Sequence, residues 1–376
     1  MPPNLSLIRG KKCTFRKAIF PGTYIQGDGA IGELPAVINR FGGKGLIVAS
    51  PSAMDGPLAK LRDQLPQGTT QVRFNGQCSD TELARLTSIL SKHGPSVVVG
   101  AGGGKAIDAA KVLADRAGLP AITLPTIAST EASCSACAIL HNEQGVAQQV
   151  HCLRRNPETV LVDSGIIARA PVRYLTSGMG NALATWFEAR SCERTASPNE
   201  CGGFRTFSSM ALARLCYDTL MEYGVPAKQA CEQRVVTPAL ERVIEANILL
   251  SGLGIECSGL AAAHSIHNGM AAYPATLPYH HGEKVAFGVL AGLHLADAVP
   301  DEMTAVYGFC VSVGLPVTFA QVGLGDASRD ELLKVAERAC APNEGIHHEA
   351  GEVTPARVLA ALLAADSMGR ARRNNA

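Results

Sequence analysis

The chain lacks any excess of charge of one sign. Its 376 residues include 34 lysines and arginines against 33 aspartates and glutamates, so the formal net charge is +1. A protein that holds nucleic acid or an anionic membrane by electrostatic attraction needs a basic field, which this composition does not supply. We therefore expect no nucleic-acid partner and no membrane partner, and a small molecule becomes the expected ligand.

Long apolar runs are also missing from the sequence. No stretch of about 18 uninterrupted apolar residues occurs, which is the length that a membrane-spanning helix needs. Residues 1–6 lack the basic-then-apolar layout of a signal peptide. The sequence therefore predicts a soluble, cytoplasmic protein.

Cysteine is present, but it is not concentrated in a short segment as in a disulfide-stapled domain. The 12 cysteines are scattered over the chain, mostly in apolar helical or strand patterns, which predicts reduced thiols. Cys134 and Cys137 have C-x-x-C spacing, yet no second pair stands at a metal-finger distance. Packing in the core is therefore favoured over a zinc or redox role for this pair.

The length and the hydrophobic content predict two domains. Hydrophobic residues make up 47% of the chain and charged residues 18%, which is enough apolar material for a large core. In the first part, apolar runs typical of buried strands alternate with helical patterns, which predicts a parallel, doubly wound α/β sheet. The expected strands are 46–49, 70–74, 96–100, 121–125 and 159–163, with an inserted hairpin of 138–141 and 146–150.

The hydrophobic pattern changes after residues 168–171, where Pro171 disfavours helical geometry in the residue before it. Beyond it, apolar residues recur at three-and-four spacing, which is typical of helices. We therefore expect an α/β domain over residues 1–168 and an all-α domain over residues 169–376. The clearest helical patterns cover 174–190, 204–223, 238–257 and 260–272.

A glycine-rich turn, Gly100-Ala101-Gly102-Gly103-Gly104-Lys105, stands between an expected strand and an expected helix. Glycines let the backbone approach a ligand closely, and the N–H groups at a helix start attract phosphate. The turn matches neither G-x-x-x-x-G-K-S/T nor G-x-G-x-x-G. It predicts a pyrophosphate site, with a ligand-free glycine turn as the alternative. Asp108 and Lys111 follow one turn later, where they are candidate site residues or ordinary surface residues of the helix.

A group of histidines forms the second candidate site. His264 and His267 lie three apart, so a helix places both on one face, and His280 and His281 follow just before Gly282. Neutral imidazoles at converging helix ends suit zinc or another divalent ion, which needs a third ligand, usually a carboxylate. The alternative is a set of ordinary histidines, one or two of them buried in a core.

Together these segments resemble the glycerol dehydrogenases, within the family of iron- or zinc-dependent alcohol dehydrogenases that shares its fold with dehydroquinate synthase. The matching blocks follow one another in the family's order between about residues 18 and 290. They are 20–27, Gly102-Gly103-Gly104-Lys105 with Asp108 and Lys111, 125–130, 170–173, 177–189, 261–269 and 281–288.

The resemblance implies a nucleotide-binding α/β domain over 1–168, a helical metal and substrate domain over 169–376, and an active site in the interdomain cleft. The family's metal positions correspond to Asn181, His264 and His281, and the metal is zinc or another divalent ion. The family has aspartate where this chain has Asn181. An amide oxygen coordinates a cation without adding negative charge, so metal affinity should be weakened.

The resemblance also implies a nicotinamide dinucleotide cofactor. Relatives that prefer NAD place an aspartate at the end of the second strand, whereas the corresponding stretch here, Val48-Ala49-Ser50-Pro51, has no acidic residue to repel the 2′-phosphate of NADP. Lys44 lies near this point in the sequence and could attract the 2′-phosphate, but no arginine follows. The resemblance slightly favours NAD, because relatives commonly use it, and NADP is the alternative. The cofactor-binding residues implied are Gly102, Gly103, Gly104, Lys105, Asp108, Thr126 and Ser129.

The implied activity is hydride transfer between a polyol or hydroxyketone and NAD or NADP, in a homo-oligomer whose partner is a small alcohol or carbonyl compound. Glu131 stands where the family has a substrate-binding aspartate, and its longer side chain either reaches a substrate hydroxyl or partly restores the charge missing at Asn181. His267 is the candidate for orienting a hydroxyl or passing a proton, with a purely structural role as its alternative. One alternative to this function is a metal-independent reductase of another carbonyl or imine, with Glu131 or His267 as proton donor. Another is a degenerate member of the family that binds nucleotide without turnover. A sugar-phosphate cyclase is disfavoured because basic residues are dispersed.

Overall fold

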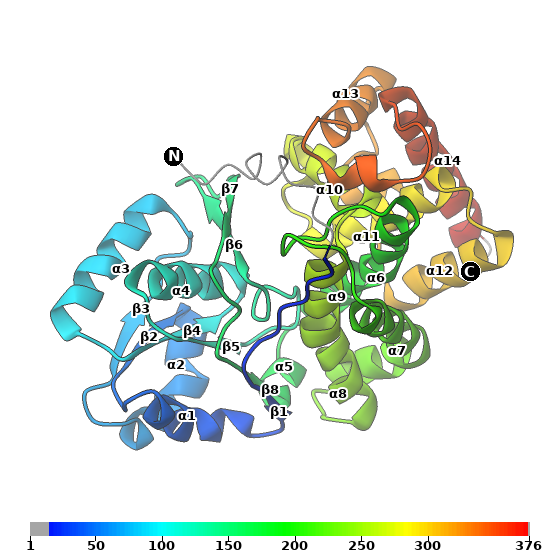
Figure 1. Cartoon of the computed structure of the whole chain (residues 1–376). Helices are drawn as coiled ribbons and strands as arrows, with labels where there is room; N and C mark the ends of the chain where they lie inside the picture. The colour runs from blue at the N-terminus through cyan, green and yellow to red at the C-terminus, as the bar shows by residue number, and fades with distance from the viewer. Residues whose placement is uncertain (1–14, 375–376) are drawn as a thin grey trace. The chain divides into compact units, whose positions relative to one another are not determined.

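The computed structural model describes residues 15–374 (Figure 1), so the expectation for residues 1–6 lies outside the described part of the chain. Contacts divide the described residues into two compact units. The sheet unit contains Phe20–Leu175 and Pro226–Gly252. The helical unit contains residues 15–19, 176–225 and 253–374.

Six parallel strands form the sheet, in the order β1-β8-β5-β4-β2-β3. Four of them, β2, β4, β5 and β8, are buried along their whole length, as central strands are when both faces of a parallel sheet are covered. The expected strands are confirmed. β1 was not expected, because its half-buried sequence YIQG has no apolar run. The bounds are β1 Tyr24–Gly27, β2 Gly45–Ala49, β3 Thr70–Arg73, β4 Val97–Gly102, β5 Ala121–Pro125 and β8 Thr159–Asp163.

Helices cover both faces of this sheet, which confirms the doubly wound fold class (Figure 1). α3 and α4 bury Leu83 and Leu113 on one face, and α1 and α2 bury Ile38 and Ala53 on the other. Asp163 caps the short α5 by accepting a hydrogen bond from the Ile166 N–H. The bounds are α1 Leu34–Arg40, α2 Pro51–Asp55, a 3-10 helix Pro57–Gln64, α3 Asp80–His93, α4 Gly104–Ala117 and α5 Ser164–Ala168.

The hairpin, β6 Cys137–His141 and β7 Ala147–Cys152, is antiparallel as expected. Two side chains of α4 hold this region. Asp108 Oδ2 accepts a hydrogen bond from the Ile139 N–H (3.0 Å), and the Lys111 ammonium lies 3.2 Å from Asp108 Oδ1. Asp108 and Lys111 are 5% and 2% exposed, so the alternative that they are surface residues is wrong. The same ammonium donates to three carbonyls, those of Ala132, Ser135 and Cys137.

The segment 226–252 groups with the sheet unit, which differs from a single boundary after residue 168. It contains α8 Pro238–Glu245 and a π-helical turn, Ala246–Leu250. Glu241 accepts hydrogen bonds from Gln26 Nε2 (2.5 Å) and the Ser164 hydroxyl (2.6 Å). The buried Asn247 amide donates to the Ala128 carbonyl (3.0 Å). Helical periodicity cannot reveal such bonds, because they depend on which distant backbone a polar side chain meets.

The remaining described residues form the helical unit, where no strand occurs within 176–225 or 253–374 apart from an isolated bridge that pairs Phe204 with Arg16. The expected helical patterns are confirmed, although their ends differ by several residues. The bounds are α6 Val172–Thr195, α7 Phe207–Glu232, α9 Ser251–Ser258, α10 Ala262–Ala271, α11 His281–Leu295, α12 Pro300–Val313, α13 Arg329–Ala339 and α14 Pro355–Asn374, with α6, α7 and α9 extending beyond the unit's own residues.

Two further findings concern residues 15–374. No single helix among them has the length and apolar composition to span a membrane, and one bent pair of consecutive helices, Pro238–Ser258 with Ala262–Ala271, meets that test only together. Each cysteine described, Cys134 and Cys137 included, carries a thiol and belongs to no disulfide bond.

Candidate functional site

Three helices of the helical unit bring Asn181, His264 and His281 together. Asn181 lies within α6, His264 is the third residue of α10, and His281 is the first residue of α11. Asn181 Oδ1 lies 2.9 Å from His281 Nε2 and 3.3 Å from His264 Nε2. The three residues expected to bind metal therefore point their donor atoms at one another, although they are up to 100 residues apart in sequence.

Glycines allow the backbones of these helices to approach closely. A Cβ atom at Gly282, next to His281, would lie 1.7 Å from the Ser177 carbonyl oxygen of α6. A Cβ at Gly180 would lie 2.3 Å from the Gly282 carbonyl oxygen, and one at Gly288 would lie 2.4 Å from that of Ala263. Because real Cβ atoms are excluded at these distances, the donor atoms can converge only while these positions are glycine.

Glu188 orients His264. Its Oε2 lies 2.6 Å from His264 Nδ1, and its Oε1 accepts hydrogen bonds from the Ala261 and His264 N–H groups (3.0 Å each). The carboxylate thus satisfies the start of α10, where Ala261 has no side chain that could cap it. It also holds the His264 proton on Nδ1, which directs the Nε2 lone pair toward Asn181. Sequence reasoning missed this role, yet the spacing of seven from Asn181 to Glu188 on one helix was the signal.

His267 contacts His281 rather than Asn181. Its Nε2 lies 3.0 Å from His281 Nδ1, and its Nδ1 lies 3.1 Å from Asn268 Oδ1. Burial, aided by the charge of Lys284, lowers the pKa of His267 to about 3. Burial also lowers the pKa of His281 well below its ordinary value. Both rings are therefore neutral near pH 7, the state in which imidazole binds metal.

The donor set fits a divalent cation. Nitrogen and oxygen ligands about 2.1 Å from a tetrahedral zinc ion lie about 3.4 Å apart. The distance from Asn181 Oδ1 to His264 Nε2 is close to this at 3.3 Å, and the distance to His281 Nε2 is shorter at 2.9 Å. Three protein ligands leave one position for substrate, as in catalytic zinc sites. Within residues 15–374, no group of three or more His, Cys, Asp or Glu side chains is placed to hold a metal. This candidate instead uses an amide as its third donor, which brings no charge.

The glycine-rich turn lies in the sheet unit, at the carboxyl end of β4. Gly102 has φ +142°, and a Cβ there would lie 2.7 Å from Ser50 Oγ, so only glycine fits. Gly103 precedes α4 without a side-chain cap, and the Thr126 N–H donates to the Gly102 carbonyl (3.0 Å). The turn and the loop after β5 therefore lie together at the edge of a parallel sheet where nucleotides bind. Ser129 belongs to the same loop and is half-buried.

The other expected site residues of the sheet unit have partners of their own. Lys105 Nζ donates to Gln77 Oε1 (2.7 Å), and Asp108 supports the hairpin as described above. Glu131 begins a turn in which its carbonyl accepts the Cys134 N–H (2.8 Å). Its half-buried side chain borders Gly252, where an added Cβ would lie 3.2 Å from the Glu131 Cβ.

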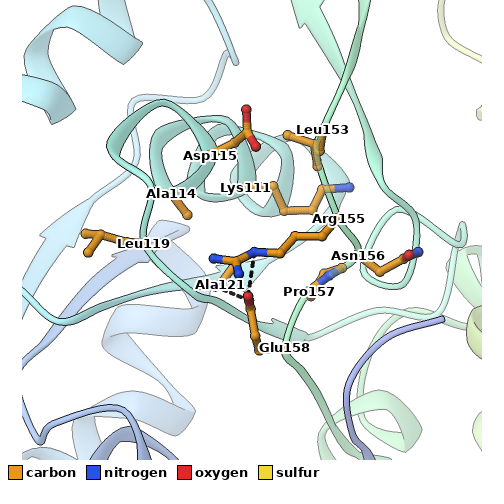
Figure 2. A pocket seen from close by; sticks show the side chains of 10 residues that line it. All are labelled: Lys111, Ala114, Asp115, Leu119, Ala121, Leu153, Arg155, Asn156, Pro157 and Glu158. Carbon is orange, nitrogen blue, oxygen red and sulfur yellow. Dashed lines mark hydrogen bonds and ion pairs between the residues drawn. The ribbon is translucent and has the colours of Figure 1, made fainter. Parts of the chain in front are cut away.

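A small cavity in the sheet unit is not a cofactor site. Figure 2 shows it beside α4, where Arg155 and the Ala121 N–H both contact the Glu158 carboxylate (2.7 Å each). Its volume of about 20 Å³ holds about one water molecule. Moreover, Ala121 is the first residue of β5, whereas cofactors bind at the carboxyl ends of parallel strands.

The chain is similar to known dehydrogenases along nearly its whole length. Residues 21–164 match the family model "Iron-containing alcohol dehydrogenase". Glycerol dehydrogenase of Thermotoga maritima is 48% identical over 361 residues, covering 95% of this chain and 98% of that protein. Glycolaldehyde reductase of Halobacterium salinarum is 40% identical, covering 93% and 97%. The crystal structure of a probable glycerol dehydrogenase from Sinorhizobium meliloti superposes with a TM-score of 0.90 at 40% identity, covering 95% and 99%. The chain therefore belongs to the iron-containing alcohol dehydrogenase family, and it is an NAD(P)-dependent oxidoreductase of the glycerol dehydrogenase type.

Proposed function

We propose that this enzyme transfers a hydride between a small polyol, or the corresponding hydroxyketone or hydroxyaldehyde, and a nicotinamide dinucleotide, with zinc or another divalent ion held by Asn181, His264 and His281. The observation that carries the proposal is that both histidine Nε2 atoms lie close to Asn181 Oδ1, His281 Nε2 at 2.9 Å and His264 Nε2 at 3.3 Å. Relatives named for glycerol and for glycolaldehyde support a substrate with neighbouring oxygen atoms.

The residues of the helical unit hold the site in a state ready for a cation. A bound divalent ion polarises a substrate hydroxyl and lowers its pKa, which favours loss of hydride from the neighbouring carbon. Glu188 keeps the His264 Nε2 lone pair directed at Asn181 and adds a buried negative charge one hydrogen bond away. Both ring nitrogens of His267 are bonded within the cluster, so we favour a structural role for it over proton transfer.

In the sheet unit, we assign the cofactor pyrophosphate to Gly102, Gly103 and Gly104. The Gly102 backbone is held in a conformation that only glycine adopts, and the start of α4 offers N–H groups without a side-chain cap. Thr126 and Ser129 follow β5 and would contact ribose or nicotinamide. Glu131 would bind a substrate hydroxyl. Assembly into a homo-oligomer stays a prediction.

Metal removal tests this proposal. The purified protein is stripped with a chelator, reloaded with zinc, dialysed, and assayed with glycerol, propanediols and glycolaldehyde in the presence of NAD or NADP. We expect about one zinc per chain and turnover that is lost on stripping and regained on reloading. Turnover that persists without metal would identify a metal-independent reductase. Nucleotide binding without turnover on any substrate would identify a degenerate member.

A charge at position 50 should change the enzyme's preference between NAD and NADP. Ser50 follows β2 and caps α2 by accepting a hydrogen bond from the Ala53 N–H (3.3 Å). Aspartate caps helices equally well, so Ser50→Asp should fold normally while adding a charge that repels a 2′-phosphate. We expect kcat/KM for NADP to fall about tenfold or more relative to NAD. An unchanged ratio would show that Ser50 does not face the adenine ribose. Ser91→Asp, at an exposed position in the last turn of α3, is the matched control.

A further inference from the structure

A line of hydrogen bonds runs through the helical unit from Arg338 to His281. Arg338 pairs with Glu344 Oε1 (2.5 Å), and Asn268 Nδ2 donates to Glu344 Oε2 (2.9 Å). Asn268 Oδ1 faces His267 Nδ1 (3.1 Å), and His267 Nε2 faces His281 Nδ1 (3.0 Å). The line ends where His281 Nε2 faces Asn181 Oδ1.

The direction of each hydrogen bond between Glu344 and His281 follows from the Glu344 carboxylate. A carboxylate only accepts hydrogen bonds, so Asn268 must turn its NH₂ group toward Glu344 and its oxygen toward His267. That oxygen also only accepts, so the His267 proton lies on Nδ1 and its Nε2 carries a lone pair. Two nitrogens 3.0 Å apart share one proton, which must therefore come from His281 Nδ1.

We propose that Glu344 and Asn268 are positioning residues that fix the His281 proton on Nδ1, and so present an unprotonated Nε2 at the metal position. This inference rests on the proposed metal-dependent function. The opposite tautomer of His281 would donate its Nε2 proton to Asn181 Oδ1 across the 2.9 Å gap, which closes the site with a hydrogen bond. The line from Glu344 excludes that closed state.

The two histidine ligands are thereby oriented by the same means over different distances. Glu188 contacts His264 directly, whereas Glu344 acts on His281 through Asn268 and His267. Carboxylates that orient metal-binding histidines are an established device, and their loss costs about 10- to 100-fold in metal affinity. The neutral amide at position 181 makes this orientation more important, because no ligand charge compensates for a histidine in the wrong tautomer.

The test measures the tautomers directly in the metal-free protein. Long-range ¹H–¹⁵N NMR of ¹⁵N-histidine-labelled protein reports which ring nitrogen carries the proton, and His281→Gln assigns the His281 signals. We expect the native protein to carry the proton on Nδ1 in both His267 and His281. In Glu344→Gln, the new amide can donate as well as accept, so the direction of the line is no longer fixed and the Nε2-protonated form should appear.

A double variant shows whether the direction of these hydrogen bonds, rather than the packing of the side chains, fixes the histidine tautomers. Asn268→Asp combined with Glu344→Gln exchanges the carboxylate and the amide, so the new carboxylate again accepts from His267 Nδ1 and the native tautomers should return. Zinc affinity, measured by competition with a chelator, should fall about tenfold in Glu344→Gln and recover in the double variant. Glu337→Gln, an exposed position on α13, is the control.

Two results would overturn the proposal. One is a native His281 that carries its proton on Nε2. The other is a folded double variant that does not regain the native tautomers. If the tautomers behave as stated but no zinc binds to any of these proteins, the metal-dependent function fails while the hydrogen-bond direction stands.

Discussion

Replacing Asn181 with aspartate is expected to raise the affinity for zinc by about 100-fold or more. The side chain keeps its size, and the oxygen that lies 2.9 Å and 3.3 Å from the two histidine nitrogens acquires a negative charge. Asn181 is fully buried, where the attraction between a carboxylate and a divalent ion is screened less than in water. The gain should exceed the 10- to 100-fold effects typical of residues that only support a ligand, because position 181 would contact the metal itself.

Chelator competition on the purified native and variant proteins measures this gain. Asn142→Asp adds the same charge at a turn of the sheet unit, where the side-chain oxygen accepts N–H groups of Gln144 and Val146, and it should leave zinc affinity unchanged. Without metal, the Asn181→Asp protein should unfold at a lower temperature than native, because its buried charge lacks a cation. Zinc should then raise its melting temperature more than that of the native protein. Equal zinc affinities would remove position 181 from the ligand set.

The sheet could be predicted from sequence because its physical signal is local. Strands such as β4 and β5 are buried on both faces, so each is a continuous apolar run bounded by turn residues. β1 has the opposite character, since its half-buried residues are held by pairing with β8 rather than by an apolar run. The grouping of α8 with the sheet depends on Glu241 and Asn247, whose partners are far away in sequence.

Some residues of the candidate site could likewise be predicted from sequence, and others could not. His264 and His281 stand in short motifs, so resemblance locates them, and Glu188 is marked by its spacing of seven from Asn181. No sequence motif or spacing identifies Glu344, because it lies 76 residues from Asn268 and its role depends on one hydrogen bond of 2.9 Å. Resemblance could also not show that both nitrogens of His267 are bonded within the cluster, which is what favours its structural role.

A glycine-to-alanine pair on α11 tests whether close helix approach builds this site. Helix propensity alone favours alanine over glycine by about 1 kcal/mol in a helix interior. At Gly292 an added Cβ would meet only the Ala262 Cβ at 3.5 Å, an ordinary contact, so Gly292→Ala should keep or slightly raise stability. At Gly282 the added Cβ would meet the Ser177 carbonyl oxygen at 1.7 Å, and backbone atoms of two helices would have to separate.

Gly282→Ala should therefore lower the free energy of unfolding by about 4 kcal/mol, a loss that single substitutions reach only through severe steric or cavity effects. Urea unfolding of the two variants beside native protein measures both changes in the free energy of unfolding, the loss in Gly282→Ala and the unchanged or slightly higher value in Gly292→Ala. Because relief of the clash moves α11 away from α6, the surviving folded Gly282→Ala protein should also lose zinc binding, since His281 Nε2 moves away from Asn181 Oδ1. If Gly282→Ala is as stable as Gly292→Ala and binds zinc normally, then close approach of these backbones does not set the ligand geometry.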